Sequence, residues 1–160
     1  MQGVQIMSII IAGIAACLAM DIFQRVLLIT TGQPPSNWAV VGRWAFHVLR
    51  TARLYHPTID SAAEIKGEHV FGWIVHYAVG IGYAIIFIGL METGLLTASL
   101  TDGLIFGFLS VIVPWFFFLP VMGKGIMGKH TPAPAKVCIL ALANHCVFGL
   151  GLAGGFQLSS

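Results

Sequence analysis

The chain has 160 residues, of which 58% are hydrophobic and only 9% are charged. A soluble globular protein carries about 25% charged residues, so this composition excludes that class. The formal net charge of +2 excludes a nucleic-acid-binding protein, and three cysteines scattered through apolar stretches exclude a disulfide scaffold. With a mean hydropathy of +0.90, the chain is expected to lie in a lipid bilayer.

Four stretches are long and apolar enough to cross a membrane. A helix needs roughly 20 apolar residues to span about 30 Å of hydrocarbon, and we predict such helices over residues 4–24, 70–91, 103–122 and 137–156. The apolar runs are continuous rather than alternating, which favours helices over barrel strands. The prediction is an all-α fold in which residues 1–160 form a single polytopic membrane domain with four transmembrane helices.

The basic residues predict how the helices are oriented. Lys and Arg are retained preferentially on the cytoplasmic side of a membrane. All eight lie in or beside the first and third connections, whereas the N-terminus, the second connection and the C-terminus contain none. We therefore expect these two connections to be cytoplasmic and both termini to lie on the outer side.

Residues 38–54, in the first connection, have the pattern of a helix lying in the membrane interface. Basic residues recur there at i, i+4 and i+7, and most apolar residues lie elsewhere around the helix. Tryptophan at headgroup depth and arginine beside anionic lipid are typical of such helices. The predicted lipid-binding residues are Trp38, Arg43, Trp44, His47 and Arg50. Simple anchoring of the helix is the alternative interpretation.

A further helix start is predicted just before the second span. Ser61 and Glu64 have the spacing of a capping box, in which each side chain bonds a backbone amide near the helix end. A helix that begins here and continues into the span has about 30 residues, so its first turns are expected to project into the cytoplasm.

The second and fourth spans share the pattern H-x3-G-x-G-x-A. In each, a histidine lies on a stripe of small residues, which lets helix backbones approach closely in lipid. The stripes are Gly72, His76, Gly80, Ala84 and Ala141, His145, Gly149, Ala153. The match predicts a parallel repeat of two helices plus two. The alternative is a similarity that comes only from glycine-rich composition.

Polar groups inside the spans are the candidates for function, because their burial in a membrane is costly. They gather toward the predicted cytoplasmic ends of the helices. In the third span, Pro114 is expected to free a backbone carbonyl that a polar partner can use. The predicted ion- or substrate-binding residues are Asp21, Arg25, Glu68, His76, Asn144 and His145.

Four interpretations of this site are open. In the first, it lines a path for a proton, ion or small solute, since histidine titrates near neutrality. In the second, His76 and His145 ligate haem b or a metal ion, with Asp21 as a further metal ligand. In the third it holds a quinone-like substrate, and in the fourth Asp21 simply pairs with Arg25 and the histidines bond carbonyls. We predict the first, a small channel, transporter or pH-responsive carrier without a cofactor. A homo-oligomer is expected, because four helices enclose little space.

One motif resembles a nucleotide-binding loop. Residues 123–130 come within one residue of the P-loop pattern, but they follow a membrane helix and carry His130 where Ser or Thr must follow the lysine. Nucleotide binding is therefore not expected. The connections contain no nucleophile elbow and no paired catalytic carboxylates, so no enzymatic activity is predicted.

Five short signatures together resemble a family of small bacterial inner-membrane proteins of unknown function. They are Met20-Asp21-Ile22-Phe23-Gln24-Arg25, Gly32-Gln33-Pro34-Pro35-Ser36-Asn37-Trp38 with Gly42-Arg43-Trp44, His76-Tyr77, Pro114-Trp115 and Asn144-His145. The resemblance implies a four-helix protein of the bacterial inner membrane, where the outer side predicted for the termini from the basic residues is the periplasm. It implies nothing about activity or binding residues.

Overall fold

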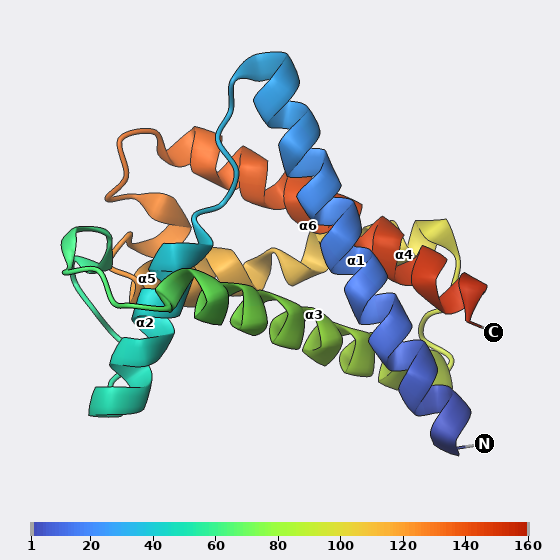
Figure 1. The fold of residues 1–160 in the computed structure, drawn as a ribbon. Coiled ribbons are helices and arrows are strands. Elements are labelled where there is room, and N and C mark those ends of the chain that lie inside the picture. The colour runs from blue at the N-terminus through green and yellow to red at the C-terminus, as the bar shows by residue number, and fades with distance from the viewer. Residues whose placement is uncertain (1, 160) are drawn as a thin grey trace. The chain divides into compact units, whose positions relative to one another are not determined.

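The computed structural model describes residues 2–159, and every regular element in that part of the chain is helical (Figure 1). Four helical segments there are long and apolar enough to cross a membrane, which confirms the predicted all-α fold with four candidate spans. They are Gln5–Thr31, Glu68–Glu92, Leu100–Val121 and Pro134–Leu158.

The elements divide between two compact units. In chain order they are α1 (Gln2–Thr31), α2 (Trp38–Thr51), the 3-10 turn η1 (Ile59–Ser61), α3 (Glu68–Glu92), α4 (Leu100–Ser110), the π-helix η2 (Pro114–Phe118), α5 (Leu119–Val121), the 3-10 turn η3 (Ile126–Gly128) and α6 (Pro134–Leu158). Unit 1 contains the chain up to residue 35, residues 77–110 and the chain from residue 142 on. Unit 2 contains residues 36–76 and 111–141.

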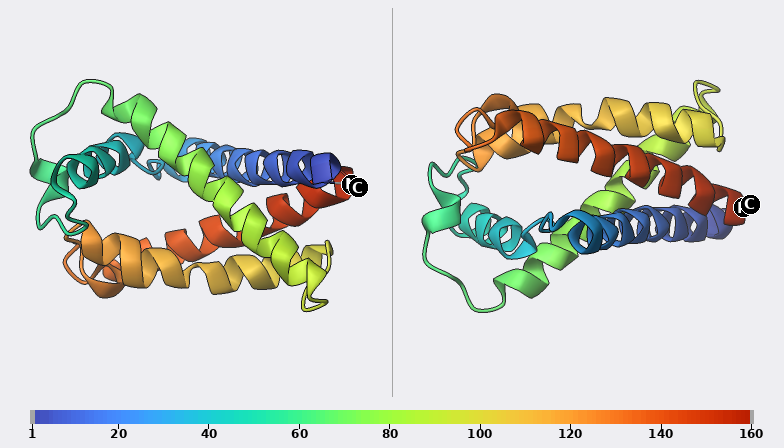
Figure 2. Two further views of the ribbon diagram at one scale, coloured as in Figure 1. Left: turned by 90° about the horizontal axis from the view of Figure 1, so that it is seen from below. Right: turned by 90° about the horizontal axis from the view of Figure 1, so that it is seen from above.

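In unit 1 the helices approach one another through small residues. A Cβ atom placed on Gly155 of α6 would lie 2.5 Å from the Cα of Ala12 in α1, and one on Gly13 would lie 2.8 Å from the Cα of Ile81 in α3. Figures 1 and 2 show α1 and the second half of α6 converging toward the same end. Small residues at these crossings allow backbone contact.

The third span is a helix that changes its winding at a proline. α4 ends at Ser110, and residues 114–118 form a π-helix that starts at Pro114. Proline has no N–H, so the Ser110 carbonyl four residues earlier loses its usual helical partner. The hydroxyl of Tyr83 donates to that carbonyl oxygen at 3.5 Å. The prediction that Pro114 frees a carbonyl for a polar partner is therefore confirmed.

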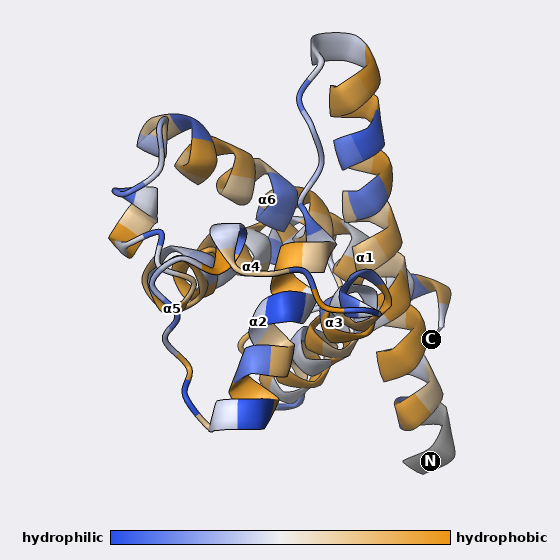
Figure 3. Ribbon diagram, turned by 60° about the vertical axis from the view of Figure 1, so that its left-hand side comes forward, coloured by the Kyte–Doolittle hydropathy of each residue, from blue (hydrophilic) through white to orange (hydrophobic). Residues whose placement is uncertain are grey.

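Unit 2 has a hydrophobic core built around α2. Trp44 is buried and packs edge-to-face on Phe118 with ring centroids 5.5 Å apart. The other buried members of this core are Val40, Ala45, Ile59 and Met122. Figure 3 shows hydrophilic and hydrophobic residues interleaved along α2, whereas most of α1 is hydrophobic. A helix with this pattern buries one face and leaves the other to the surroundings.

The predicted capping box is wrong. Only a 3-10 turn forms at residues 59–61, and α3 begins at Glu68 rather than near residue 61. The Ser61 hydroxyl donates back to the Thr58 carbonyl at 3.1 Å, and Gly67 has a left-handed φ of 87°. These local bonds and the turn at Gly67 divide the predicted long helix, because helical geometry cannot pass through a left-handed residue.

The end of α2 provides a first test of the fold. Ala52 caps this helix with φ 54° and ψ 22°, a left-handed conformation that costs a residue with a Cβ about 1–2 kcal/mol. Ala52→Gly is expected to raise the free energy of unfolding by about 1 kcal/mol, measured by denaturant unfolding in detergent micelles. Ala62 has ordinary extended φ and ψ, so Ala62→Gly is the matched control and should lower the free energy of unfolding. Equal effects of both changes would contradict this explanation.

Candidate functional site

A buried ion pair lies in unit 2 between α2 and the start of α3. The Arg43 Nε atom donates to Glu68 Oε2 at 2.8 Å, and Nη2 donates to Oε1 at 2.6 Å. Arg43 is 6% exposed and Glu68 is 7% exposed. A bidentate contact of this kind is the strong form of an arginine–carboxylate bond.

The remaining donors of this ion pair bind the preceding loop. Arg43 Nη1 donates to the backbone carbonyls of Ile59, Asp60 and Ala62, at 3.3, 3.3 and 2.9 Å. The hydrogen bond to Glu68 is the main reason why the pKa of Arg43 is raised above its usual value. Arg43 therefore stays cationic and fixes α2, residues 59–62 and the start of α3 together.

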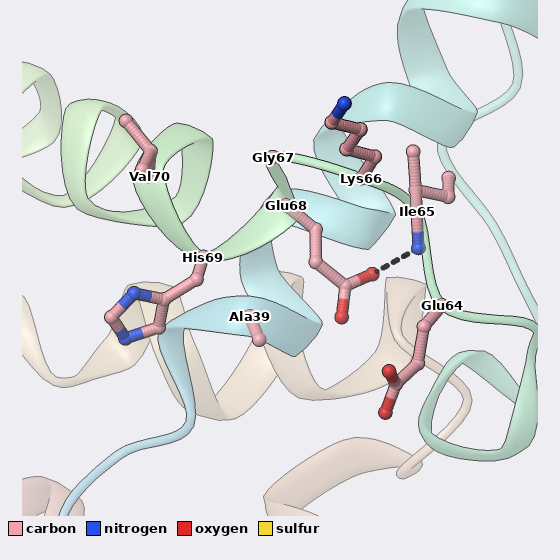
Figure 4. A pocket seen from close by; sticks show the side chains of 8 residues that line it. All are labelled: Ala39, Glu64, Ile65, Lys66, Gly67, Glu68, His69 and Val70. Atoms are coloured by element: carbon pink, nitrogen blue, oxygen red, sulfur yellow. Dashed lines mark hydrogen bonds between the residues drawn. The ribbon is translucent and has the colours of Figure 1, made fainter.

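A shallow pocket lies beside this ion pair. It is lined by Ala39 and residues 64–70, from the start of α2 and the turn that leads into α3. Figure 4 shows the Glu68 carboxylate turned back along the chain, where it accepts a hydrogen bond from the Ile65 N–H at 2.8 Å. Because Glu68 already binds Arg43 and Ile65, the structure assigns its carboxylate to holding this turn.

A second polar group lies in unit 1, and we call Tyr83, Ser110 and His145 the histidine cluster. Ser110 Oγ lies 2.8 Å from His145 Nδ1. The Tyr83 hydroxyl reaches the Ser110 carbonyl, and the Tyr83 ring meets the imidazole edge-to-face with centroids 6.1 Å apart. Three helices, α3, α4 and α6, each contribute one member.

The contacts of Ser110 bear on the tautomer of the histidine. Its hydroxyl donates to the Gly107 carbonyl at 2.8 Å, and a serine hydroxyl has one proton to give. With this hydroxyl proton assigned to Gly107, Ser110 Oγ accepts from His145, and the tautomer consistent with that assignment has the proton on Nδ1 and the lone pair on Nε2. Within residues 2–159, the hydrogen bond of His145 is made through Nδ1, and the Nε2 atom makes none.

The three other predicted residues of unit 1 have different surroundings. Asp21 Oδ2 accepts a hydrogen bond from the Tyr77 hydroxyl at 3.1 Å, and Arg25 is exposed one turn further along α1. The Oδ1 atom of Asn144 is buried and has no hydrogen-bond partner among the described residues. A buried acceptor of this kind is uncommon and requires an explanation.

The two histidines of the sequence repeat have different contacts. His76 is buried in unit 2, where its ring stacks on Trp38 at 4.0 Å with an angle of 20° between the planes. His145 belongs to unit 1 and bonds Ser110. Among the described residues, no three His, Cys, Asp or Glu side chains come together as metal ligands.

The predicted lipid-binding residues do not share one exposed face. Arg43 and Trp44 are buried, and the Trp44 indole donates to the Leu54 carbonyl at 2.7 Å. Trp38 stacks on His76, and His47 meets His56 with ring centroids 4.8 Å apart. Of these five side chains, only Arg50 is exposed.

Sequence reasoning missed Tyr77, Tyr83 and Ser110. Their hydroxyls give no strong signal in a hydrophobic helix, where serine and tyrosine are also ordinary packing residues. The sequence contains one signal for Ser110. It lies four residues before Pro114, so its backbone carbonyl is the one that the proline leaves without a helical partner.

Comparison with known proteins leaves the activity open. No curated protein matches the chain, and no solved structure matches it. One family model does, over residues 10–158, and it carries the description "Protein of unknown function (DUF2938)". Because that match covers nearly the whole chain, and the four apolar helices fit a small helical membrane protein, this chain belongs to the DUF2938 family.

Proposed function

We propose that this chain is a small membrane transporter or pH-responsive carrier whose working site is the histidine cluster. The observation that carries the proposal is the meeting of Tyr83, Ser110 and His145 from three helices of a largely apolar unit. Polar groups removed from water cost free energy, and those inside membranes commonly mark proton, ion or solute paths.

The chemistry of His145 favours a proton as the species that is bound. In the tautomer that donates from Nδ1 to Ser110, a proton can join or leave Nε2 without disturbing the hydrogen bond that orients the ring. The titratable group against it from a neighbouring helix is Tyr83, which is neutral at physiological pH. The buried acceptor of Asn144, one residue earlier, adds a second polar atom on α6.

The distribution of charge supports an orientation in the bacterial inner membrane. Seven of the eight Lys and Arg residues belong to unit 2, and the eighth is Arg25 in unit 1. The positive-inside rule then favours a cytoplasmic position for the connections of unit 2, and periplasmic termini.

Proton flux into liposomes tests this function. Purified protein is reconstituted with a pH-sensitive dye inside the vesicles, and a potassium diffusion potential drives proton entry. The wild type is expected to acidify the interior faster than empty vesicles. His145→Gln retains a side chain that can bond Ser110 but cannot titrate, so its rate is expected to fall to that of empty vesicles.

The matched control is His69→Gln, because His69 is an exposed histidine at the start of α3. Its flux should equal the wild-type rate. A wild type no faster than empty vesicles, or a His145→Gln variant as fast as the wild type, would disprove the proposal. Gel filtration of each variant in detergent separates loss of transport from loss of folding.

A further inference from the structure

The end of α2 presents large apolar side chains and arginines on one exposed segment, residues 49–55. Leu49 is 71% exposed, Leu54 48% and Tyr55 61%. Arg50 and Arg53 lie between them and are also exposed. The segment lies outside the four candidate spans, so its apolar side chains are not explained as part of a membrane-crossing helix.

The backbone of this segment is held in place, so the exposure does not come from a loose chain. The Ala52 N–H donates to the Val48 carbonyl at 2.8 Å, and the Arg53 N–H donates to Thr51 Oγ1 at 3.2 Å. The Leu54 carbonyl accepts from the buried Trp44 indole at 2.7 Å. A fixed backbone with projecting side chains favours binding of a partner, because the segment loses little conformational entropy when it binds.

The charges of the segment identify the chemistry of that partner. In the part of the chain that the structure describes, Arg50 and Arg53 form no ion pair, whereas Arg43 and Lys124 have carboxylate partners. The Arg50 guanidinium lies 5.7 Å from the centre of the Phe46 ring, a contact that leaves its N–H donors available. A partner must therefore supply anionic oxygens to the arginines and an apolar layer to the leucines.

We propose that residues 49–55 dock on anionic phospholipid headgroups, with Leu49, Leu54 and Tyr55 entering the boundary between headgroups and acyl chains. A membrane surface offers both kinds of contact. The surface differs from the predicted lipid-binding set, because Arg43 and Trp44 face the protein core and Arg53, Leu54 and Tyr55 take their place. The proposal is independent of the histidine cluster.

The test follows the environment of residue 54 in full-length protein. Leu54→Cys is made in a background with Cys17, Cys138 and Cys146 replaced by alanine, and carries a fluorescent label. The protein is reconstituted in bilayers of phosphatidylcholine alone or with added phosphatidylglycerol, and quenching by acrylamide, which is uncharged, reports exposure to water. Phosphatidylglycerol is expected to protect the label.

Removal of the two arginines separates docking from other causes of protection. Arg50→Gln with Arg53→Gln should weaken docking by roughly tenfold or more, because each basic residue near an anionic surface adds to the attraction. The matched control, Lys129→Gln with Lys136→Gln, removes two other exposed cations of unit 2 and should retain the protection. Quenching that is equal in both bilayers, or protection that survives loss of Arg50 and Arg53, overturns the proposal.

Discussion

Glu68→Ala is expected to lower the free energy of unfolding by about 3–5 kcal/mol, because it leaves the Arg43 guanidinium buried without its counter-charge. The guanidinium is bound through both Nε and Nη2 to this one carboxylate, and Arg43 is only 6% exposed. The same change removes the acceptor for the Ile65 N–H, so the turn before α3 also loses a bond. Denaturant unfolding in detergent micelles, followed by tryptophan fluorescence, measures the loss.

The second ion pair of unit 2 is the control. Lys124 Nζ lies 3.2 Å from Asp60 Oδ1, and the Asp60 side chain is 58% exposed. Exposed pairs contribute about 1 kcal/mol or less, so Asp60→Ala should have a small effect. Arg43→Met combined with Glu68→Met removes both buried charges and should recover part of the stability that Glu68→Ala loses. Equal losses for Glu68→Ala and Asp60→Ala would show that burial does not set the strength of the pair.

This ion pair is a feature that could not be predicted from the sequence. The helix near residues 38–51 could be predicted from local periodicity, as could the four apolar spans from length and hydropathy. The same periodicity placed Arg43 on one face with His47 and Arg50. In the structure Arg43 is buried and Arg50 exposed, because Glu68 and three backbone carbonyls of residues 59–62 bind the Arg43 guanidinium. That contact joins residues distant in the chain, and no local pattern contains it.

The histidine cluster was predictable only in part. His145 and the carbonyl freed by Pro114 both follow from the sequence, since an intramembrane histidine and a proline within a span are local signals. That these two features meet, through Ser110 and Tyr83, depends on how α3, α4 and α6 pack. The stripes of small residues indicated close packing without identifying which helices meet.

Gly72→Ala is expected to destabilise the protein by about 1–3 kcal/mol or more, although alanine favours helices over glycine. A Cβ atom on Gly72 would overlap the backbone carbonyl of Trp38, and one on Gly42 would overlap the carbonyl of Glu68. Both obstacles are backbone atoms, so no flexible side chain can move aside. The start of α2 must therefore shift away from α3, and the stack of Trp38 on His76 should weaken with it.

Gly82→Ala, on the same helix, is expected to have the opposite sign. A Cβ atom there meets nothing within 4 Å, so the change should raise the free energy of unfolding by about 0.5–1 kcal/mol through helix propensity alone. Denaturant unfolding measures both variants, and the tryptophan emission should change for Gly72→Ala only, because Trp38 leaves its stacked position. A stabilising Gly72→Ala would mean that α2 does not pack against α3 through this glycine. Changes of opposite sign in the free energy of unfolding would show that the close packing of α2 on α3 requires Gly72, whereas Gly82 only lowers the helix propensity of α3.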